Sequence, residues 1–214
     1  MSDLLKVRIG GSNYLCKWEP SNEVEIGGRK YKTVKIGSQI WMAENLDWKW
    51  NELTIGGERI NSPRALYYNN DESSYGYNGM KFGLLYNNPA KDYIRDNLLT
   101  TSDGWRLPTE SDTNALNAFI DDALNIGYKL SEEVSWSDSS WTGNNQYGFN
   151  GIPVGQWNSD RQSFRYHGFE MIFWHSESDY VYERDATEQT GLNLFLSVPS
   201  LVGFYSIRLV KDAT

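Results

Sequence analysis

Gly104-Trp105-Arg106-Leu107-Pro108-Thr109-Glu110 leads into the clearest helical pattern of the chain. Pro108 holds the preceding residue extended, and the hydroxyl of Thr109 can accept a hydrogen bond from the free amide of Asp112. Apolar residues then recur at the spacing of one helix face: Leu116, Phe119, Ile120, Ala123 and Leu124. Gly127 is a natural left-handed stop. The stretch predicts a helix over about 109–126 whose apolar stripe is a core face.

Short strands joined by glycine turns are expected on both sides of this helix. The pairs Gly27-Gly28 and Gly37-Ser38 interrupt strand-like sequence and predict strands at 24–26, 29–36 and 39–42. Short aromatic strands between polar loops are expected over 128–203. The alternating run 204–210 predicts a closing strand that is buried on one face.

The segment 49–103 is rich in Asn, Tyr and Gly and lacks sustained periodicity, so long irregular loops are expected there. One short helix is predicted over about 89–96, with Asn88 as N-cap and Pro89 at the first helical position. No exact internal repeat and no flexible linker is found, so a second domain is not expected. The pattern as a whole indicates the α+β class.

Aromatic residues carry much of the hydrophobic content, with 9 Trp, 14 Tyr and 8 Phe in 214 residues. Such side chains can fill a core and can also present a binding surface. The formal net charge of −8, with no basic run among the aromatics, argues against nucleic-acid binding and against anionic membrane surfaces. Cys16 is the only cysteine, which excludes an intrachain disulfide and a cluster of thiolate metal ligands.

No apolar run is long enough to span a bilayer, and the amino terminus has no hydrophobic signal core. The sequence therefore predicts a soluble protein without membrane insertion. Two explanations for the missing signal peptide stay open: the protein is not secreted by the usual route, or an export signal has been removed.

Six ordered segments share the pattern of one known family. They are Trp41-Met42-Ala43-Glu44-Asn45-Leu46, Phe82-Gly83-Leu84-Leu85-Tyr86-Asn87, residues 104–110, Gly148-Phe149-Asn150-Gly151-Ile152-Pro153-Val154-Gly155, Phe173-Trp174-His175-Ser176-Glu177 and Ser206-Ile207-Arg208-Leu209-Val210-Lys211-Asp212. In this order they resemble the Fibrobacter succinogenes major paralogous domain, over roughly residues 24–212. The resemblance implies a C-type-lectin-like fold, a small helix-flanked β core whose long irregular segment displays a variable surface.

The resemblance divides the chain into a domain at 24–214 and an amino-terminal extension at 1–23. It also implies a role on bacterial surfaces, where the family is common. Within the matching segments, Trp41, Trp105 and Trp174 are predicted to fill the core, because surfaces as large as theirs usually serve cores.

Enzymatic alternatives find little support in the sequence. Residues 104–110 also resemble the formylglycine-generating relatives of this fold, but that oxidase chemistry needs paired cysteines and Cys16 has no partner. A hydrolase is the other option, yet His167 and His175 lie in no nucleophile elbow or His-Glu-x-x-His pattern. No catalytic residue is assigned, and the chain is predicted not to be an enzyme.

Calcium stays open as a cofactor, because oxygen ligands are abundant on the expected loops. The candidate ligands are Asn69, Asn70, Asp71 and Glu72, or Asp138, Asn144 and Asn145. No ordered acidic loop motif joins them, so no cofactor is assigned.

The late loops concentrate the Tyr, Trp, Arg and Asn side chains that recognition surfaces favour. The candidate ligand-binding residues are Trp141, Asn144, Asn145, Tyr147, Trp157, Asn158, Arg161, Tyr166, His175, Tyr180, Tyr182 and Arg184. The leading hypothesis is a non-catalytic surface module that binds a glycan or a protein partner, on a bacterial cell or on a virion as a phage receptor-binding or decoration protein. The alternative is a structural subunit of a larger surface or virion assembly, and a hydrolytic enzyme is the least favoured.

The extension at 1–23 contains strand-like residues 5–9 and 13–18 around Gly10-Gly11, which predicts a hairpin. A two-stranded hairpin is marginal by itself and must dock on the main domain or on another chain. We therefore expect an assembly or anchoring role for this segment, self-association included.

Overall fold

The computed structural model describes residues 4–9, 12–17, 22–58, 61–73, 81–121, 126–132, 143–176, 181–185 and 203–213. Only the backbone is described for 4–9, 12–17, Thr101 and 181–185. The strands are β1 (Leu4–Ile9), β2 (Ser12–Lys17), β3 (Glu23–Ile26), β4 (Arg29–Ile36), β5 (Gln39–Met42), β6 (Thr54–Ile55), β7 (Arg64–Tyr67), β8 (Leu84–Tyr86), β9 (Gln156–Asn158), β10 (Ser163–Arg165), β11 (Glu170–Trp174), β12 (Val181–Asp185), β13 (Gly203–Phe204) and β14 (Val210–Asp212). The helical segments are η1 (Tyr68–Asn70), α1 (Asn88–Tyr93), η2 (Ile94–Leu98), η3 (Leu99–Thr101), α2 (Glu110–Ile120) and α3 (Ile126–Leu130).

The architecture is of the α+β class with mostly antiparallel pairing, as the sequence predicts. The amino-terminal strands β1 and β2 pair antiparallel, which confirms the predicted hairpin. A second antiparallel pair joins β11 to β12.

Among the helices of the described ranges, none has the length and apolar content needed to cross a membrane.

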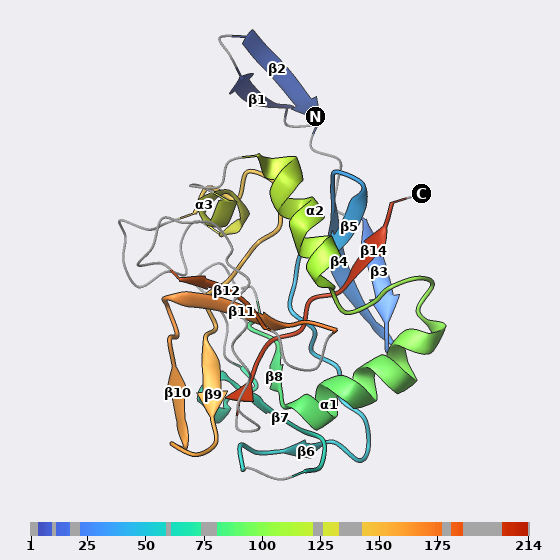
Figure 1. The fold of residues 1–214 in the computed structure, drawn as a ribbon, viewed down its shortest axis with the longest axis vertical. Helices are drawn as coiled ribbons and strands as arrows, with labels where there is room; N and C mark the ends of the chain where they lie inside the picture. Colours follow the sequence, from blue (N-terminus) through green and yellow to red (C-terminus); the bar gives the residue numbers. More distant parts are fainter. Residues whose placement is uncertain are drawn as a thin grey trace.

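The central sheet has the order β14-β5-β4-β3, and its strands agree with those predicted at 24–26, 29–36 and 39–42. Gly27, Gly28 and Gly37 have φ values of 60°, 79° and 62°, so the turns need residues that tolerate the left-handed region. Successive side chains of a strand point to opposite faces. Accordingly Trp41 packs in a core cluster with Leu116 of α2, whereas Met42 packs in a second cluster with Ala90 of α1. Figure 1 shows α2 lying along β4 and β5.

Helix α2 begins where the sequence predicts but ends earlier. The Thr109 hydroxyl accepts a hydrogen bond from the Asp112 amide, and the Asp112 side chain accepts one from the Thr109 amide, closing a capping box. The predicted end at about 126 is wrong: Asp121 adopts a left-handed conformation with φ 45° and stops the helix after Ile120. A single residue in this conformation redirects the chain.

The shorter helix changes the predicted apolar stripe. Leu116 and Ile120 are buried, but Phe119 is 53% exposed, so its assignment to the core face is wrong. Gly127 lies inside α3 and does not end α2. Ala123 and Leu124 lie outside the described residues.

The segment 49–103 contains more regular structure than the sequence indicates. Strand β7 pairs antiparallel with β8 and parallel with β6, so the prediction of irregular loops is wrong for these strands. Asn87, and not Asn88, caps α1, because its side chain accepts a hydrogen bond from the Ala90 amide. The helical path then continues through η2 and η3 to Thr101, beyond the predicted end at about 96.

The carboxyl-terminal segment 203–212 runs through the middle of the protein. Its backbone joins β9 and β5 as β13 and β14, and between them Tyr205 exchanges hydrogen bonds with Tyr86. Residues 203–210 are all buried, so the prediction of a continuous strand with one buried face is wrong. Elements on both sides cover this segment, which leaves its polar residues no exposed face.

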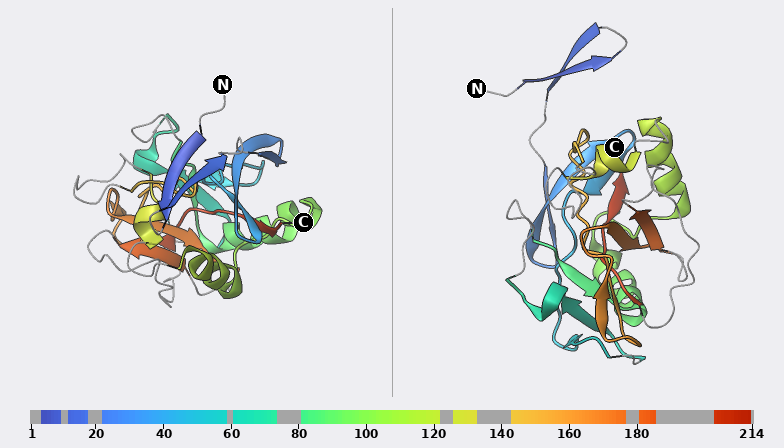
Figure 2. Two further views of the ribbon diagram at one scale, coloured as in Figure 1. Left: turned by 90° about the horizontal axis from the view of Figure 1, so that it is seen from above. Right: turned by 90° about the vertical axis from the view of Figure 1, so that its left-hand side faces the viewer.

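A third core cluster supports the hairpin of β9 and β10. Leu66 of β7 and Leu85 of β8 face this cluster, while their neighbours Ala65 and Leu84 face the cluster of α1. In Figure 1 the β9–β10 hairpin and α1 accordingly lie on opposite sides of β7 and β8. The second view of Figure 2 places the same hairpin toward the viewer. Trp157 and Phe204 fill the space under it.

Candidate functional site

Three of the six motif segments meet at one buried arginine, and a fourth is linked to it through Asn45. Arg208 is 0% exposed and donates from Nε to Asn45 Oδ1 at 2.7 Å and from Nη2 to the Asn150 carbonyl at 2.6 Å. Its Nη1 donates to the carbonyl of Phe149, whose ring centroid lies 4.6 Å from the guanidinium. Asn45 in turn donates to the Phe82 carbonyl at 2.9 Å. Burial lowers the pKa of Arg208 to about 9.

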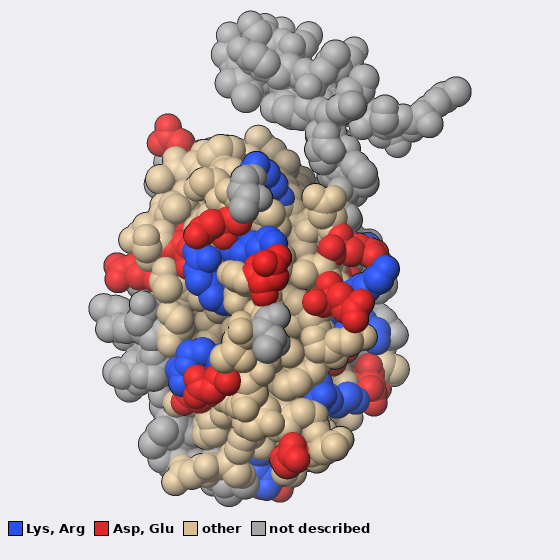
Figure 3. Space-filling view, turned by 90° about the vertical axis from the view of Figure 1, so that its right-hand side faces the viewer, with Lys and Arg blue, Asp and Glu red and all other residues tan. Residues whose placement is uncertain are grey.

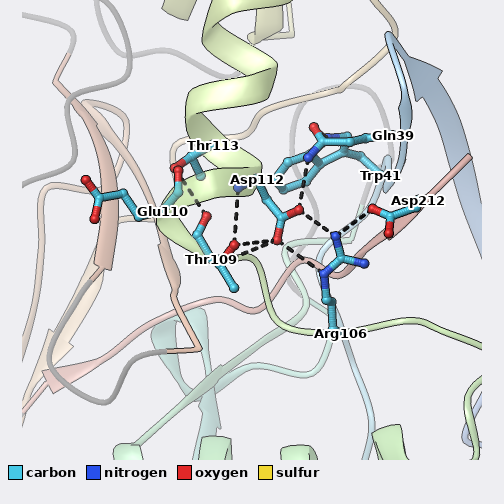
Figure 4. A network of polar contacts seen from close by, with 8 residues as sticks. All are labelled: Gln39, Trp41, Arg106, Thr109, Glu110, Asp112, Thr113 and Asp212. Carbon is cyan, nitrogen blue, oxygen red and sulfur yellow. Dashed lines mark hydrogen bonds and ion pairs between the residues drawn. The ribbon is translucent and has the colours of Figure 1, made fainter.

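A second network ties the segment 104–110 to the central sheet (Figure 4). Arg106 Nη2 donates to Asp112 Oδ1 at 2.6 Å and to Asp212 Oδ1 at 2.7 Å, and Gln39 Nε2 donates to Asp112 Oδ1 at 3.0 Å. Burial acts to raise the pKa of Asp112, but the hydrogen bonds from Arg106 and Thr109 outweigh it and lower the pKa. The same carboxylate thus caps α2 and joins it to β5 and β14.

The indole side chains of the motifs are buried as predicted. Trp41 and Trp174 are 0% exposed and Trp105 is 4% exposed. Trp174 Nε1 donates to the Tyr86 carbonyl at 2.7 Å. The motif residues therefore hold the core together, and a binding surface has to be sought among the other candidates.

Four of the predicted ligand-binding residues lie on the β9–β10 hairpin or directly after it. Trp157 is only 8% exposed, and its Nε1 donates to the Gly57 carbonyl at 2.9 Å. Asn158 Oδ1 accepts a hydrogen bond from the Arg161 amide at 2.9 Å and so orders the tip of the hairpin. Tyr166, at the opposite end of β10, is 41% exposed.

Three further predicted residues form a separate turn near α2 and α3. Asn145 lies in the left-handed region at φ 45°, and its Oδ1 accepts a hydrogen bond from the Asn150 amide at 2.8 Å. Asn144 is exposed, and Tyr147 packs edge-on against Phe119 at 6.1 Å between ring centroids. The side-chain amide of Asn145 therefore shapes the turn at 145–150.

The remaining predicted residues contribute no described surface. His175 is 0% exposed, directly after β11. Tyr182 and Arg184 lie on β12 opposite Phe173 and Met171, and only their backbone is described. Trp141 and Tyr180 lie outside the described residues.

The most distinctive surface is the turn formed by residues 165–169. Tyr166 and Phe169 are 41% and 42% exposed, and the Arg165 guanidinium lies 5.0 Å from the centroid of the Tyr166 ring. Tyr166 has a φ of 60°, a left-handed conformation that costs a non-glycine residue about 1–2 kcal/mol. Such strain persists only where neighbouring structure imposes it, and it is found most often at functional sites.

Backbone contacts hold this turn in place. The Gly168 amide donates to the Pro153 carbonyl at 2.9 Å, and the Gly155 amide donates to the Glu170 carbonyl at 3.0 Å. A Cβ atom on Gly155 would lie 2.2 Å from the Arg165 carbonyl oxygen, so this approach requires glycine. The motif segment 148–155 therefore serves as the support on which the exposed turn rests.

Aromatic rings from distant parts of the chain pack under the turn. The imidazole of His167 stacks on Tyr68 with 3.8 Å between ring centroids, and Phe82 meets it edge-on at 5.3 Å. Burial lowers the pKa of His167, against the opposing effect of a hydrogen bond with the Val154 backbone. Sequence reasoning missed Tyr68 and Phe82 in this role, although the Tyr67-Tyr68-Asn69-Asn70 run was the available signal.

The described ranges contain no group of three or more His, Cys, Asp and Glu side chains that could hold a metal ion. At the predicted calcium ligands, Asp71 Oδ1 accepts from the Ser73 amide at 2.8 Å and from its hydroxyl at 2.7 Å. Glu72 pairs with Lys49 at 2.8 Å. Asp138 lies outside the described residues, so calcium at that group stays untested.

Comparison with known proteins identifies one family. The model of the Fibrobacter succinogenes major domain matches residues 34–211, which include β5, α2 and the 165–169 turn but not β3 of the central sheet. No curated protein and no solved structure matches the chain.

Proposed function

Because the chain belongs to the Fibrobacter succinogenes major domain family, we propose that it is a non-catalytic module that binds a glycan through the 165–169 turn. The proposal includes a C-type-lectin-like fold, which the helix-flanked antiparallel sheet closed by β14 supports. It also includes a location on the surface of a bacterial cell or a virion, where such a turn would meet its ligand.

The observation that carries the proposal is an exposed pair of aromatic residues on a rigid support. Tyr166 and Phe169 stand on one short turn that is anchored to residues 153–155 and backed by the stacked ring of His167. An exposed aromatic side chain on a preorganised backbone loses little conformational entropy when a ligand binds. Sugar rings present C–H faces that pack on such side chains.

The size of the surface favours a glycan over a protein partner. A stable protein interface buries about 800 Å² on each partner around an apolar centre. In the part of the chain that the structure describes, the other large apolar side chains at the surface, Ile55, Phe119 and Tyr128, belong to other elements. Two aromatic side chains suit a ligand of a few sugar rings.

Binding to an immobilised glycan array tests the function. Tyr166→Ala and Phe169→Ala should each weaken binding to the recognised glycans about tenfold, the loss expected for one stacked aromatic contact. Tyr128→Ala is the matched control, because Tyr128 is 42% exposed on α3 and should leave binding unchanged.

Two results would contradict the proposal. Equal loss in all three variants would show that the turn is not the binding surface. Failure of every glycan, together with capture of a protein that Tyr166→Ala abolishes, would favour a protein partner or the alternative role in a larger assembly.

A further inference from the structure

Arg165 differs from most other described arginines in the groups that its guanidinium contacts. Arg29, Arg64, Arg95 and Arg106 each pair with a carboxylate. Arg208 is buried among carbonyl and amide oxygens. Among the side chains that the structure describes, no carboxylate pairs with Arg165 or Arg161.

This difference stands out because the protein carries an excess of carboxylates, with 28 Asp and Glu against 20 Lys and Arg. On the face shown in Figure 3, Lys and Arg side chains lie beside Asp and Glu side chains. The hairpin and turn at 156–169 instead contain one acidic residue, Asp160, and two arginines, Arg161 and Arg165. Among the described side chains, Arg165 is therefore a cation without a carboxylate partner, and it lies beside the exposed ring of Tyr166.

Arg165 is also preorganised, whereas Arg161 is not. Arg165 is half-buried on β10, and its guanidinium lies over the Tyr166 ring at 5.0 Å from the centroid. Stacking on an aromatic ring leaves the edge of the guanidinium, with its N–H donors, free to donate to the oxygen atoms of an anion. Arg161 is exposed at the tip of the hairpin, where its amide and not its side chain makes the described contact.

We propose that Arg165 binds a carboxylate or sulfate group of the ligand, so that the glycan recognised by the 165–169 turn is acidic. This inference rests on the proposed function and adds the chemical class of the ligand. The net charge of −8 repels a polyanion at long range. A preference for an acidic glycan over its neutral form must therefore come from a local cation.

Matched pairs of polymers provide the test. Polygalacturonate and its methyl-esterified form share one backbone and differ in whether the carboxyl groups are charged or esterified, and dextran sulfate and dextran form a second pair. Calorimetric titration at about 0.15 M salt, where long-range repulsion is screened, measures the Kd of each polymer. We expect the wild type to bind one acidic polymer at least about tenfold more tightly than its neutral partner, through one charge-assisted contact.

Variants separate the local contact from overall charge. Arg165→Gln should reduce the ratio of the two affinities to about one while leaving the neutral polymer unaffected, and Arg165→Lys should retain part of the ratio. Arg161→Gln removes the same charge from the same hairpin and should leave the ratio unchanged. Circular dichroism of each variant confirms that it is folded.

The outcomes distinguish this inference from the proposed function. If acidic and neutral polymers bind with equal affinity and Tyr166→Ala abolishes binding of both, the ligand is not selected for its charge. That result overturns the inference about an acidic ligand but supports glycan binding by the turn. A ratio that falls equally in Arg161→Gln and Arg165→Gln also overturns it, because overall charge would then be the cause. Binding to none of these polymers and to no glycan of the array contradicts the proposed function as well.

Discussion

At the scale of single residues, the fold depends on polar side chains that lie in the core. Arg208 connects Asn45 with the adjacent residues Phe149 and Asn150, and both positions are far from it and from each other along the chain. A buried guanidinium is tolerated here because three oxygen acceptors and the Phe149 ring replace its hydration. Its role is to join three motif segments at one point.

Replacing Arg208 with Met should lower the free energy of unfolding by at least about 3 kcal/mol, because buried acceptors left without a donor cost about 1–3 kcal/mol each. Urea unfolding followed by tryptophan fluorescence measures this loss. Arg161→Met is the control and should change stability by less than about 0.5 kcal/mol, since Arg161 is exposed. Similar midpoints for the two variants would show that the Arg208 contacts contribute little.

His167 should make stability depend on pH. Burial against Tyr68 and Phe82 lowers its pKa, so the folded state binds a proton less readily than the unfolded state, in which the pKa has its ordinary value near 6.5. The contribution of the neutral ring is therefore fully present above about pH 6.5 and is lost as the pH falls through the lowered folded-state pKa. Acid should weaken the support under the 165–169 turn.

The measurement is the urea midpoint of the wild type and of His167→Phe at about pH 7.5 and about pH 5.5, on either side of the ordinary histidine value. The phenyl ring keeps the stack on Tyr68 but cannot titrate. We expect the wild type to lose more stability between the two pH values than the variant loses. An equal loss in both proteins would assign the pH dependence to other groups.

At the scale of elements, side-chain caps in the adjacent sequence determine where the helices begin. The apolar pattern of the sequence does not determine where they end. Thr109 and Asp112 form the start of α2 within four residues of each other. The end at Ile120 depends on Asp121, whose left-handed conformation interrupts an apolar pattern that continues beyond it. Helix α1 shows the same asymmetry, with a cap at Asn87 and a path that continues through η2 and η3.

The Thr109 cap can be tested by a single substitution. Thr109→Ala removes the acceptor for the Asp112 amide and should lower the free energy of unfolding by about 1 kcal/mol. Ser111→Ala is the matched control, because Ser111 is exposed in the same first turn and caps nothing in the described contacts. Equal effects of the two substitutions would indicate that helix propensity, and not the cap, determines the change.

At the scale of the whole molecule, three core clusters pack around the central segment 203–212, which contributes Ile207, Val210 and Phe204 to them. The family match begins at residue 34 and the central sheet begins with β3 at Glu23. The Asn22 carbonyl accepts a hydrogen bond from the Thr33 amide at 2.7 Å, so the sheet also needs Asn22. An assembly or anchoring role for residues 1–23 stays a prediction.

Deleting residues 1–21 should change the free energy of unfolding by less than about 0.5 kcal/mol, because it removes none of the described core contacts. If the hairpin of β1 and β2 mediates self-association, the deletion should also convert oligomers into monomers, which light scattering measures directly. Unfolding of the shortened chain would show instead that the hairpin belongs to the core.

The sequence by itself determined the features that depend on neighbouring residues. The glycine turns at 27–28 and 37–38, the Thr109 cap and the strands at 24–42 follow from interactions within a few residues, and six motifs in order identified the family. Within the candidate site, sequence reasoning selected Tyr166 and Arg161 from residue type alone. It also selected Trp157 and His175, which proved to be buried.

Only the tertiary structure decided which distant residues meet. The contacts of Arg208 with Asn45 and of Trp157 with Gly57 join positions 163 and 100 residues apart. Tyr68 likewise reaches His167 only because β7 and the β9–β10 hairpin share one core cluster. The spacing of apolar residues indicates which side of an element is buried, but it does not show which other segments pack against that element. The alternating pattern of 203–210 therefore resembles that of a strand with one buried face, although the segment is covered on both faces. The support of the 165–169 turn therefore emerges from packing between segments whose proximity no local pattern encodes.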